Sequence, residues 1–331
     1  MASDIAVPAR FAIETQDIEY RRNGAAPLLA RLYRPRGGGP FPAVVEVHGG
    51  AWAAGDRLNN APLDEALAKS GIVVLAIDFR MPPAHRYPAS IADIHFATRW
   101  LKAHAAAFGS RRELVGGLGT SSGAHQLLLS ALKPADPRYA ALPLPDAPAE
   151  EAWLPYLVLC WPISDPLARY RMAKEKGNAR LVESHDAYWA SEAEMAEGNP
   201  QLVLERGEAT ALPPAIVVQG TGDDNVTPDM ADRFAAAWRA RGGVLWSPPT
   251  RIGSPRSSAF TSSPDRVSYS SSACATLCRS SRCSVRMRRA VLSASSIRRR
   301  ISSSMILAVA PDRWIWRVTE WPRNTSSSLL A

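Results

Sequence analysis

The sequence predicts an α/β fold in which helices flank a mostly parallel central sheet, and two observations support this prediction. Mostly apolar runs cover residues 42–47, 72–77, 156–161 and 214–219, as expected for strands that are covered on both faces. Segments with helical periodicity separate these runs. Such alternation of strands and helices is typical of parallel strands joined by crossover helices.

The first elements follow from local patterns. Residues 11–20 and 28–33 alternate apolar and polar side chains around an Arg-Asn-Gly turn, which predicts a β-hairpin. Residues 60–70 have helical periodicity, and Gly71 follows them at the position where a helix end favours glycine. Pro88 predicts the start of a second helix with a regular apolar side.

The chain is organised around Gly119-Thr120-Ser121-Ser122-Gly123, a G-x-S-x-G pattern. An apolar run precedes it and helix-prone sequence follows, so it predicts a strand, a sharp turn and a helix, the setting of a nucleophilic serine. A glycine two residues to either side of Ser121 removes a Cβ that would collide with the strand and helix packed there. Ser121 is therefore the candidate nucleophile. The alternative is a Gly/Ser turn without chemistry.

A second motif, His48-Gly49-Gly50-Ala51-Trp52, directly follows the strand predicted at 42–47. Two successive glycines expose two backbone N–H groups that no side chain covers, as an oxyanion hole requires. The N–H groups of Gly49, Gly50 and Ser122 are therefore the candidate oxyanion donors. His48 is expected to support this loop rather than to transfer protons.

With these motifs the chain resembles the α/β-hydrolase superfamily, specifically its esterase and lipase branch with an HGG oxyanion motif, which includes hormone-sensitive lipase and small acyl esterases. Asp78-Phe79-Arg80, Tyr87-Pro88 and Asp93 extend the resemblance, which covers roughly residues 10–243. The resemblance implies the α/β-hydrolase fold and a serine carboxylic ester hydrolase with no cofactor and no metal. We expect His48, Trp52 and Trp161 at the substrate pocket, where the tryptophans would favour short acyl chains.

A charged, helix-prone insertion covers residues 163–213, and the resemblance implies a cap over the active site there; a surface helical excursion is the alternative. The strand predicted at 214–219 then leads into Gly220-Thr221-Gly222-Asp223. An acid after a glycine turn at a strand end is where a triad carboxylate belongs, and the family's G-x-x-D pattern selects Asp223. The alternative is that Asp223 and Asp224 only cap the helix that follows.

The triad histidine is missing from the printed chain. The fold places it after the acid, whereas all six histidines precede Asp223, namely His48, His85, His95, His104, His125 and His185. We call the turn at residues 119–123 the elbow. We expect His125 to pack in the helix that follows it, the elbow helix, and His185 belongs to the insertion. A serine hydrolase without its base keeps only a residual ~10³ to 10⁴-fold rate over water, so we expect little or no esterase activity from this chain.

The sequence changes character after Trp246. Residues 1–246 form the expected hydrolase core, and 247–331 form an Arg/Ser-rich tail in which the last strand and helix of the fold are not recognisable. From residue 245 onward there are 14 Arg, no Lys and 3 acids, whereas the preceding part has 25 basic and 28 acidic residues. The net charge of +8 therefore belongs to the tail. A frameshift, a disordered basic tail that contacts nucleic acid by charge, and a novel folded extension are the three hypotheses.

The remaining composition narrows the class of protein. The sequence has no apolar leader-like segment and no window of ~18 apolar residues, so we expect no membrane partner. Cys160 is the one cysteine before the tail, which favours a reducing, cytoplasmic setting without disulfides. We expect a small-molecule ester as partner and no nucleic acid at the core, and the oligomeric state stays open.

Two other functions stay open: amide hydrolysis of the kynurenine formamidase type, whose HGGxW motif the chain also resembles, and a non-catalytic binding protein.

Overall fold

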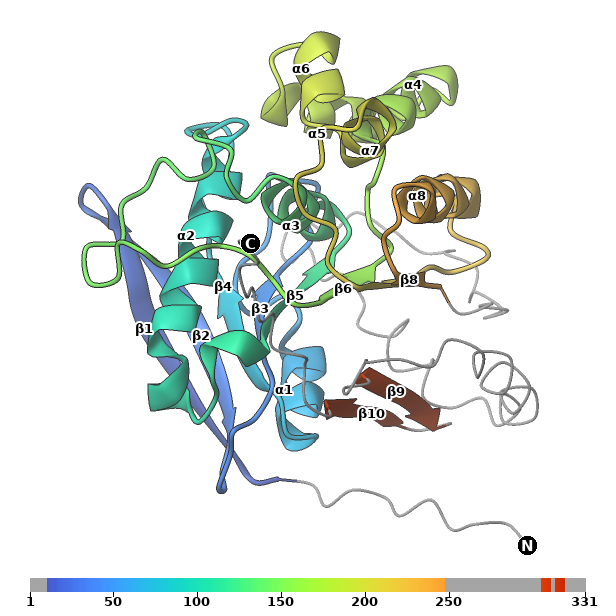
Figure 1. Ribbon diagram of the computed structural model, residues 1–331. Helices are drawn as coiled ribbons and strands as arrows, with labels where there is room; N and C mark the ends of the chain where they lie inside the picture. The colour runs from blue at the N-terminus through green and yellow to red at the C-terminus, as the bar shows by residue number, and fades with distance from the viewer. Residues whose placement is uncertain (1–10, 248–304, 311–312, 319–331) are drawn as a thin grey trace, which may run out of the picture. The chain divides into compact units, whose positions relative to one another are not determined.

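The computed structural model describes residues 11–247, 305–310 and 313–318. The chain divides into two compact units, one of residues 11–269 and one of residues 1–10 and 270–331. The first unit contains an eight-stranded sheet in the order β1-β2-β4-β3-β5-β6-β7-β8 (Figure 1). β1 (Ile13–Asn23) and β2 (Ala26–Pro35) form the predicted hairpin, and β2 runs antiparallel to β4.

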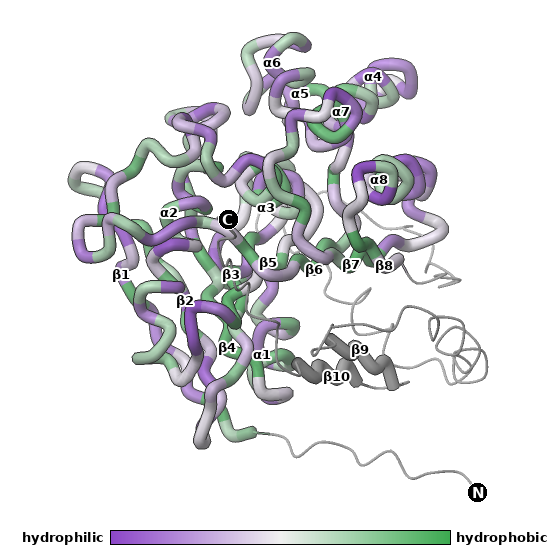
Figure 2. The backbone as a smooth tube through the Cα atoms, in the orientation of Figure 1, coloured by the Kyte–Doolittle hydropathy of each residue, from purple (hydrophilic) through white to green (hydrophobic). Residues whose placement is uncertain are grey.

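The other neighbouring strands of this sheet pair in parallel, which confirms the predicted mostly parallel α/β sheet. They are β3 (Ala43–Val47), β4 (Val73–Ile77), β5 (Val115–Thr120), β6 (Leu157–Cys160), β7 (Ala215–Val218) and β8 (Leu245–Trp246). Every residue of β3, β4 and β5 is buried, because helices and loops cover both faces of the central strands. Figure 2 shows the corresponding band of hydrophobic backbone through the middle of the sheet.

Four helices accompany the strands: α1 (Ala61–Lys69), α2 (Ala89–His104), α3 (Ser122–Leu132) and α8 (Pro228–Ala240). Two short 3-10 segments, Ala105–Phe108 and Arg112–Leu114, connect α2 to β5. Gly71 follows α1 with a φ of 94°, so the residue expected past the helix end does adopt a left-handed conformation. None of the helices in the described part of the chain is long and apolar enough to cross a membrane.

The insertion between β6 and β7 is helical. It contains α4 (Pro166–Glu175), α5 (Ala179–Tyr188), α6 (Glu192–Glu197) and α7 (Pro200–Arg206), which lie together beyond one end of the sheet (Figure 1). Each helix begins after a residue whose side chain accepts a hydrogen bond from a backbone N–H of the first turn; these residues are Asp165, Asn178, Ser191 and Asn199. The role of the insertion as a cap over the active site stays a prediction.

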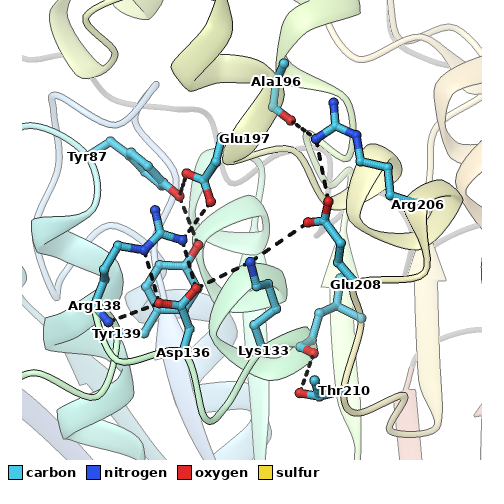
Figure 3. Close-up of polar contacts among 11 residues, drawn as sticks. Tyr87, Lys133, Asp136, Arg138, Tyr139, Ala196, Glu197, Arg206, Glu208 and Thr210 are labelled. Carbon is cyan, nitrogen blue, oxygen red and sulfur yellow. Dashed lines mark hydrogen bonds and ion pairs between the residues drawn. The ribbon is translucent and has the colours of Figure 1, made fainter.

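A polar network fastens the insertion to the core (Figure 3). Glu197, at the end of α6, accepts hydrogen bonds from the Tyr87 hydroxyl at 2.5 Å and from Arg138 at 2.6 Å. Tyr87 also lies 3.0 Å from the Tyr139 hydroxyl, and Arg138 also pairs with Asp136 at 2.8 Å. The network therefore joins the start of α2 and the loop after α3 to the insertion.

The sheet ends at β8, whose two residues pair in parallel with β7. Residues 248–304 are outside the described part, so the predicted loss of the last strand and helix is tested only as far as Ser247. In the second unit β9 (Met305–Ala310) and β10 (Arg313–Val318) pair antiparallel. The rest of the Arg/Ser-rich tail, with its predicted disorder, lies outside the described residues.

Candidate active site

Ser121 is the turn between β5 and α3. Its φ of 52° and ψ of −118° are a conformation that an L-residue adopts only under strain. Backbone hydrogen bonds hold the turn: the Ser121 N–H donates to the Cys160 carbonyl at 2.9 Å, and the Ser121 carbonyl accepts from the N–H of Ile163 at 3.3 Å. The turn is therefore fixed by β6 and by the first residues after it.

Steric contacts explain why glycine occupies both ends of the G-x-S-x-G pattern. A Cβ on Gly119 would lie 2.6 Å from the Ala124 Cα, and a Cβ on Gly123 would lie 2.2 Å from the Val47 carbonyl oxygen. Both distances are far below van der Waals contact and both involve backbone atoms. Any larger residue would push the elbow away from α3 or from β3.

The His-Gly-Gly loop lies directly against the elbow. A Cβ on Gly49 would lie 3.2 Å from the Ser121 Cβ. Gly50, Ala51 and Trp52 then have φ values of 128°, 51° and 66°, three successive positive values. At Gly50 a Cβ would lie 1.8 Å from the Ala54 carbonyl oxygen, so this position requires glycine.

Two hydroxyl groups clamp this loop to the elbow. Thr120 Oγ1 accepts the Gly49 N–H at 2.9 Å, and Ser122 Oγ accepts the Trp52 N–H at 3.2 Å. The acceptors are the two residues that flank Ser121 in the sequence, and we refer to Thr120 and Ser122 as the hydroxyl clamp.

The clamp bears on the choice of oxyanion donors, which stays a prediction. The Gly49 N–H, one of the predicted donors, already has an acceptor in Thr120. Within the described residues the N–H groups of Gly50 and Ala51 have no protein acceptor. Ser122 begins α3, so its N–H is one of the unpaired donors of a first helical turn. Because the backbone N–H of any residue type can donate, Ala51 joins the candidate donors, although a pattern based on glycines does not single it out.

His48 supports the His-Gly-Gly loop through a hydrogen bond and a ring contact. Its ring is 1% exposed, stacks on Phe79 with 4.4 Å between centroids, and its Nδ1 donates to the Gly49 carbonyl at 2.6 Å. Burial lowers the pKa of His48, so the ring is neutral. The expected supporting role fits these contacts, and its place at the substrate pocket stays a prediction.

Both ring nitrogens of His125 make hydrogen bonds inside the protein. Trp52 Nε1 donates to His125 Nδ1 at 3.1 Å, and His125 Nε2 donates to the Gly198 carbonyl at 2.8 Å. Because both ring nitrogens are bonded and burial lowers the pKa of His125 to about 3, the ring has no lone pair for a serine proton. This agrees with the expectation that His125 packs in the elbow helix.

Trp52 sits at the centre of a buried aromatic group that joins the His-Gly-Gly loop to the insertion. It is 1% exposed and packs against His185, Tyr188 and Trp189 with centroid distances of 4.9, 5.6 and 4.5 Å. Burial lowers the pKa of His185 to about 4, and its Nδ1 donates to the carbonyl of Leu181 at 2.7 Å. Trp52 therefore anchors the loop, and contact between its ring and an acyl chain stays a prediction.

The remaining predicted residues follow neighbouring parallel strands. Ser121 follows β5, Trp161 follows β6 and Asp223 lies in the loop after β7. The carboxyl ends of parallel strands meet at one edge of a sheet, where open α/β sheets bind their ligands. Trp161 is half-buried with a φ of 40°, and its N–H donates to the Val218 carbonyl at 2.6 Å.

Asp223 organises its own loop. Its Oδ1 accepts from the N–H groups of Asn225 at 3.0 Å and Val226 at 2.9 Å, and its Oδ2 accepts from Gln219 at 3.2 Å. The residue before α8 is Thr227, so the carboxylate binds the loop and not the first turn of that helix. These contacts speak against the alternative in which Asp223 serves only as a helix cap.

Arg169 connects the acid loop to the His-Gly-Gly loop. This buried residue of α4 donates to the Asn225 carbonyl at 3.2 Å and to Asn225 Oδ1 at 2.5 Å. Its guanidinium lies 5.8 Å over the Trp52 ring. The insertion thus contributes a cation that fixes both loops, a role that no local sequence pattern signals.

Within residues 11–247, 305–310 and 313–318 no group of His, Cys, Asp and Glu side chains is arranged to hold a metal ion. All six histidines of the sequence precede Asp223, and hydrogen bonds to both ring nitrogens exclude His125 as a base. The structure brings together Ser121, the His-Gly-Gly loop and the hydroxyl clamp at one strand end. In the part of the chain that the structure describes, the hydrogen bonds of His48, His125 and His185 go to other groups than Ser121.

Comparison with known proteins identifies the family. The BD-FAE family matches residues 31–237, which is more than half of the chain. The Mycobacterium tuberculosis carboxylic ester hydrolase LipN is 30% identical over 230 residues, 67% of this chain and 58% of that protein. The probable carboxylic ester hydrolase LipM of the same organism is 36% identical over 126 residues, 37% of this chain and 29% of that protein. The chain thus spans less than two thirds of the length of these relatives.

Solved structures agree with the fold. Esterase 2 of Thermogutta terrifontis, solved with butyrate bound, has a TM-score of 0.56 at 23% identity and covers 70% of this chain and 81% of that chain. The hyperthermophilic esterase of Pyrobaculum calidifontis has a TM-score of 0.57 at 23% identity over 71% and 74% of the two chains. The chain therefore has the α/β-hydrolase fold and belongs to the BD-FAE family.

Proposed function

We propose that the chain is built as a serine-dependent carboxylic ester hydrolase for small-molecule esters. One observation carries the proposal: the hydroxyl clamp binds the N–H groups of Gly49 and Trp52 and, among the described residues, leaves those of Gly50 and Ala51 without a protein acceptor, in a loop that lies against Ser121. Paired backbone donors next to a strained serine are the arrangement that acyl transfer requires.

In this mechanism Ser121 Oγ attacks the acyl carbonyl, and its proton passes to a base. The N–H groups of Gly50, Ala51 and Ser122 stabilise the negative oxygen of the tetrahedral intermediate. The alcohol leaves, and water then releases the acid from the acyl-enzyme. Asp223 is the residue that would orient the imidazolium of a triad histidine. Because no histidine follows Asp223, we propose that the printed chain retains only residual activity.

Short acyl chains are the proposed substrates. The relative from Thermogutta terrifontis was solved with butyrate, a short acid, and the half-buried Trp161 stands next to the elbow at the end of β6. A large ring at that position would limit the length of the acyl chain. Acetyl and butyryl esters should therefore react faster than esters of long-chain acids.

The test compares the purified 331-residue chain with its Ser121→Ala variant on p-nitrophenyl acetate. We expect hydrolysis far below the 1 to 10³ s⁻¹ typical of enzymes, roughly 10³ to 10⁴-fold over water, and nearly equal in Ser121→Ala, because this residual catalysis comes from the oxyanion hole and binding. Hydrolysis no faster than in water, together with no labelling of Ser121 by a fluorophosphonate, would favour a non-catalytic binding protein. Ordinary enzymatic turnover would disprove the proposed loss of the base.

A further inference from the structure

Asn60 stands at the N-terminal cap position of α1, yet its side chain does not cap that helix. Asparagine is favoured at such positions because its side-chain oxygen accepts a backbone N–H of the first turn. Here the amide nitrogen instead donates to Glu46 Oε1 at 2.7 Å and to Thr120 Oγ1 at 3.1 Å. The side chain thus contacts Thr120, the residue before Ser121, instead of the first turn of α1.

Glu46 is a fixed and buried acceptor for that amide. It lies on β3, is 0% exposed and stands in register with Leu118 of β5, two residues before Thr120. Asp64 of α1 is equally buried and electrostatically close, so two carboxyl groups share the space between α1 and the sheet. Burial raises the pKa of both, and the neighbouring Glu46 carboxyl adds to the rise at Asp64.

Thr120 Oγ1 is the point where this network meets the oxyanion loop. It accepts one hydrogen bond from Asn60 and one from the Gly49 N–H. A hydroxyl oxygen has two acceptor sites, so the two donors occupy both and fix the orientation of the side chain.

We propose that Asn60 and Thr120 are positioning residues for the oxyanion hole. Asn60, held by Glu46, orients the Thr120 hydroxyl. Thr120 then keeps the Gly49 N–H, so that the next two N–H groups of the loop point toward Ser121. This inference rests on the proposed function, because it gives these residues a role in acyl transfer.

The first test measures amide hydrogen exchange in the peptide that spans residues 47–54. Thr120→Val removes the acceptor at nearly constant volume, and Thr120→Ser is the matched control that keeps the hydroxyl. We expect exchange in this peptide to accelerate roughly 3- to 10-fold in Thr120→Val, the effect of losing one hydrogen bond, with parental exchange in Thr120→Ser. Exchange in β4 should be unchanged in both.

Asn60→Ala provides an independent variant if Thr120→Val fails to fold. Its control is Asn59→Ala, which changes the neighbouring asparagine that lies outside this network. We expect faster exchange at residues 47–54 in Asn60→Ala and parental exchange in Asn59→Ala. Parental exchange in both Thr120→Val and Asn60→Ala would overturn the positioning role.

The second readout is the rate at which p-nitrophenyl acetate acetylates Ser121, followed by intact mass. Thr120→Val should react at least about 10-fold more slowly, as expected when an oxyanion donor is misplaced, and Thr120→Ser should restore the parental rate. Thr120→Val reacting as fast as the parent would show that the clamp does not serve the chemistry. Absence of acetylation in the parent itself would reject the proposed function, and hydrogen exchange would then decide the positioning of the loop.

Discussion

Ser121 adopts a backbone conformation that costs an L-residue on the order of 1–3 kcal/mol, and the surrounding hydrogen bonds maintain it. Glycine at this position would relieve that strain. It would also increase the conformational entropy of the unfolded chain, which lowers the free energy of unfolding by about 0.4–1 kcal/mol. We therefore expect Ser121→Gly to be more stable than Ser121→Ala by about 1 kcal/mol. Chemical denaturation of the two variants measures the difference. Equal stabilities would mean that the turn is not strained in solution.

The buried carboxyl group of Glu46 should make the stability of the protein depend on pH. Burial raises its pKa from the usual value near 4.5 to about 7. Between these values the folded state holds a proton that the unfolded chain has released, so the free energy of unfolding should fall as the pH rises from about 4.5 to about 7. The expected loss is on the order of 1–3 kcal/mol.

Glu46→Gln keeps an acceptor for Asn60 and cannot ionise, so it should lose less stability over this pH range. The control is Glu183→Gln, which changes an exposed carboxylate of α5. This control should keep the full dependence. Denaturant titrations at several pH values give the comparison, and a parental pH dependence in Glu46→Gln would assign the effect to another group.

At the scale of elements, Glu197 is the point where α6 is tied to the core. Burial opposes its ionisation, but the hydrogen bonds from Arg138 and Tyr87 outweigh burial and lower the pKa of Glu197. Glu197→Gln weakens both contacts and should reduce stability by about 1–2 kcal/mol, with faster proteolysis within the insertion. The control Glu192→Gln changes an exposed carboxylate of α6 that pairs with Arg171, and its effect should stay within about 0.5 kcal/mol. Similar losses in both variants would contradict a special role for the network of Figure 3.

Local patterns predicted the elements well because each depends on neighbours in sequence. The run at 72–77 became β4, and the periodic segment at 60–70 became α1. The contacts that shape the site join residues far apart: Thr120 with Gly49, and Arg169 with Asn225. No periodicity or short motif encodes such pairs, so the sequence indicated the elbow and the loop but not the hydrogen bonds between them.

At the scale of the whole molecule, the charge and the fold divide at the same place. The part before residue 245 carries 25 basic and 28 acidic residues and accounts for the α/β-hydrolase sheet up to β8. The excess of arginine begins where the last strand has formed only two residues. The composition changes at the same point of the chain at which β8 ends after two residues. This coincidence favours a shift of reading frame over a basic tail that evolved to bind nucleic acid.

The coding DNA across residues 241–255 tests this hypothesis directly. We expect one of the other two frames to continue β8 as a full apolar strand, followed by a glycine loop with a histidine and a final helix. The protein read in that frame should hydrolyse p-nitrophenyl acetate faster than the printed chain by a factor on the order of 10⁶, the size of the loss when a triad histidine is removed. If neither frame supplies a histidine, the frameshift hypothesis fails. Ser121 and the oxyanion loop would then belong to a protein that keeps the geometry of acyl transfer without a base, and ligand binding would replace turnover as its expected activity.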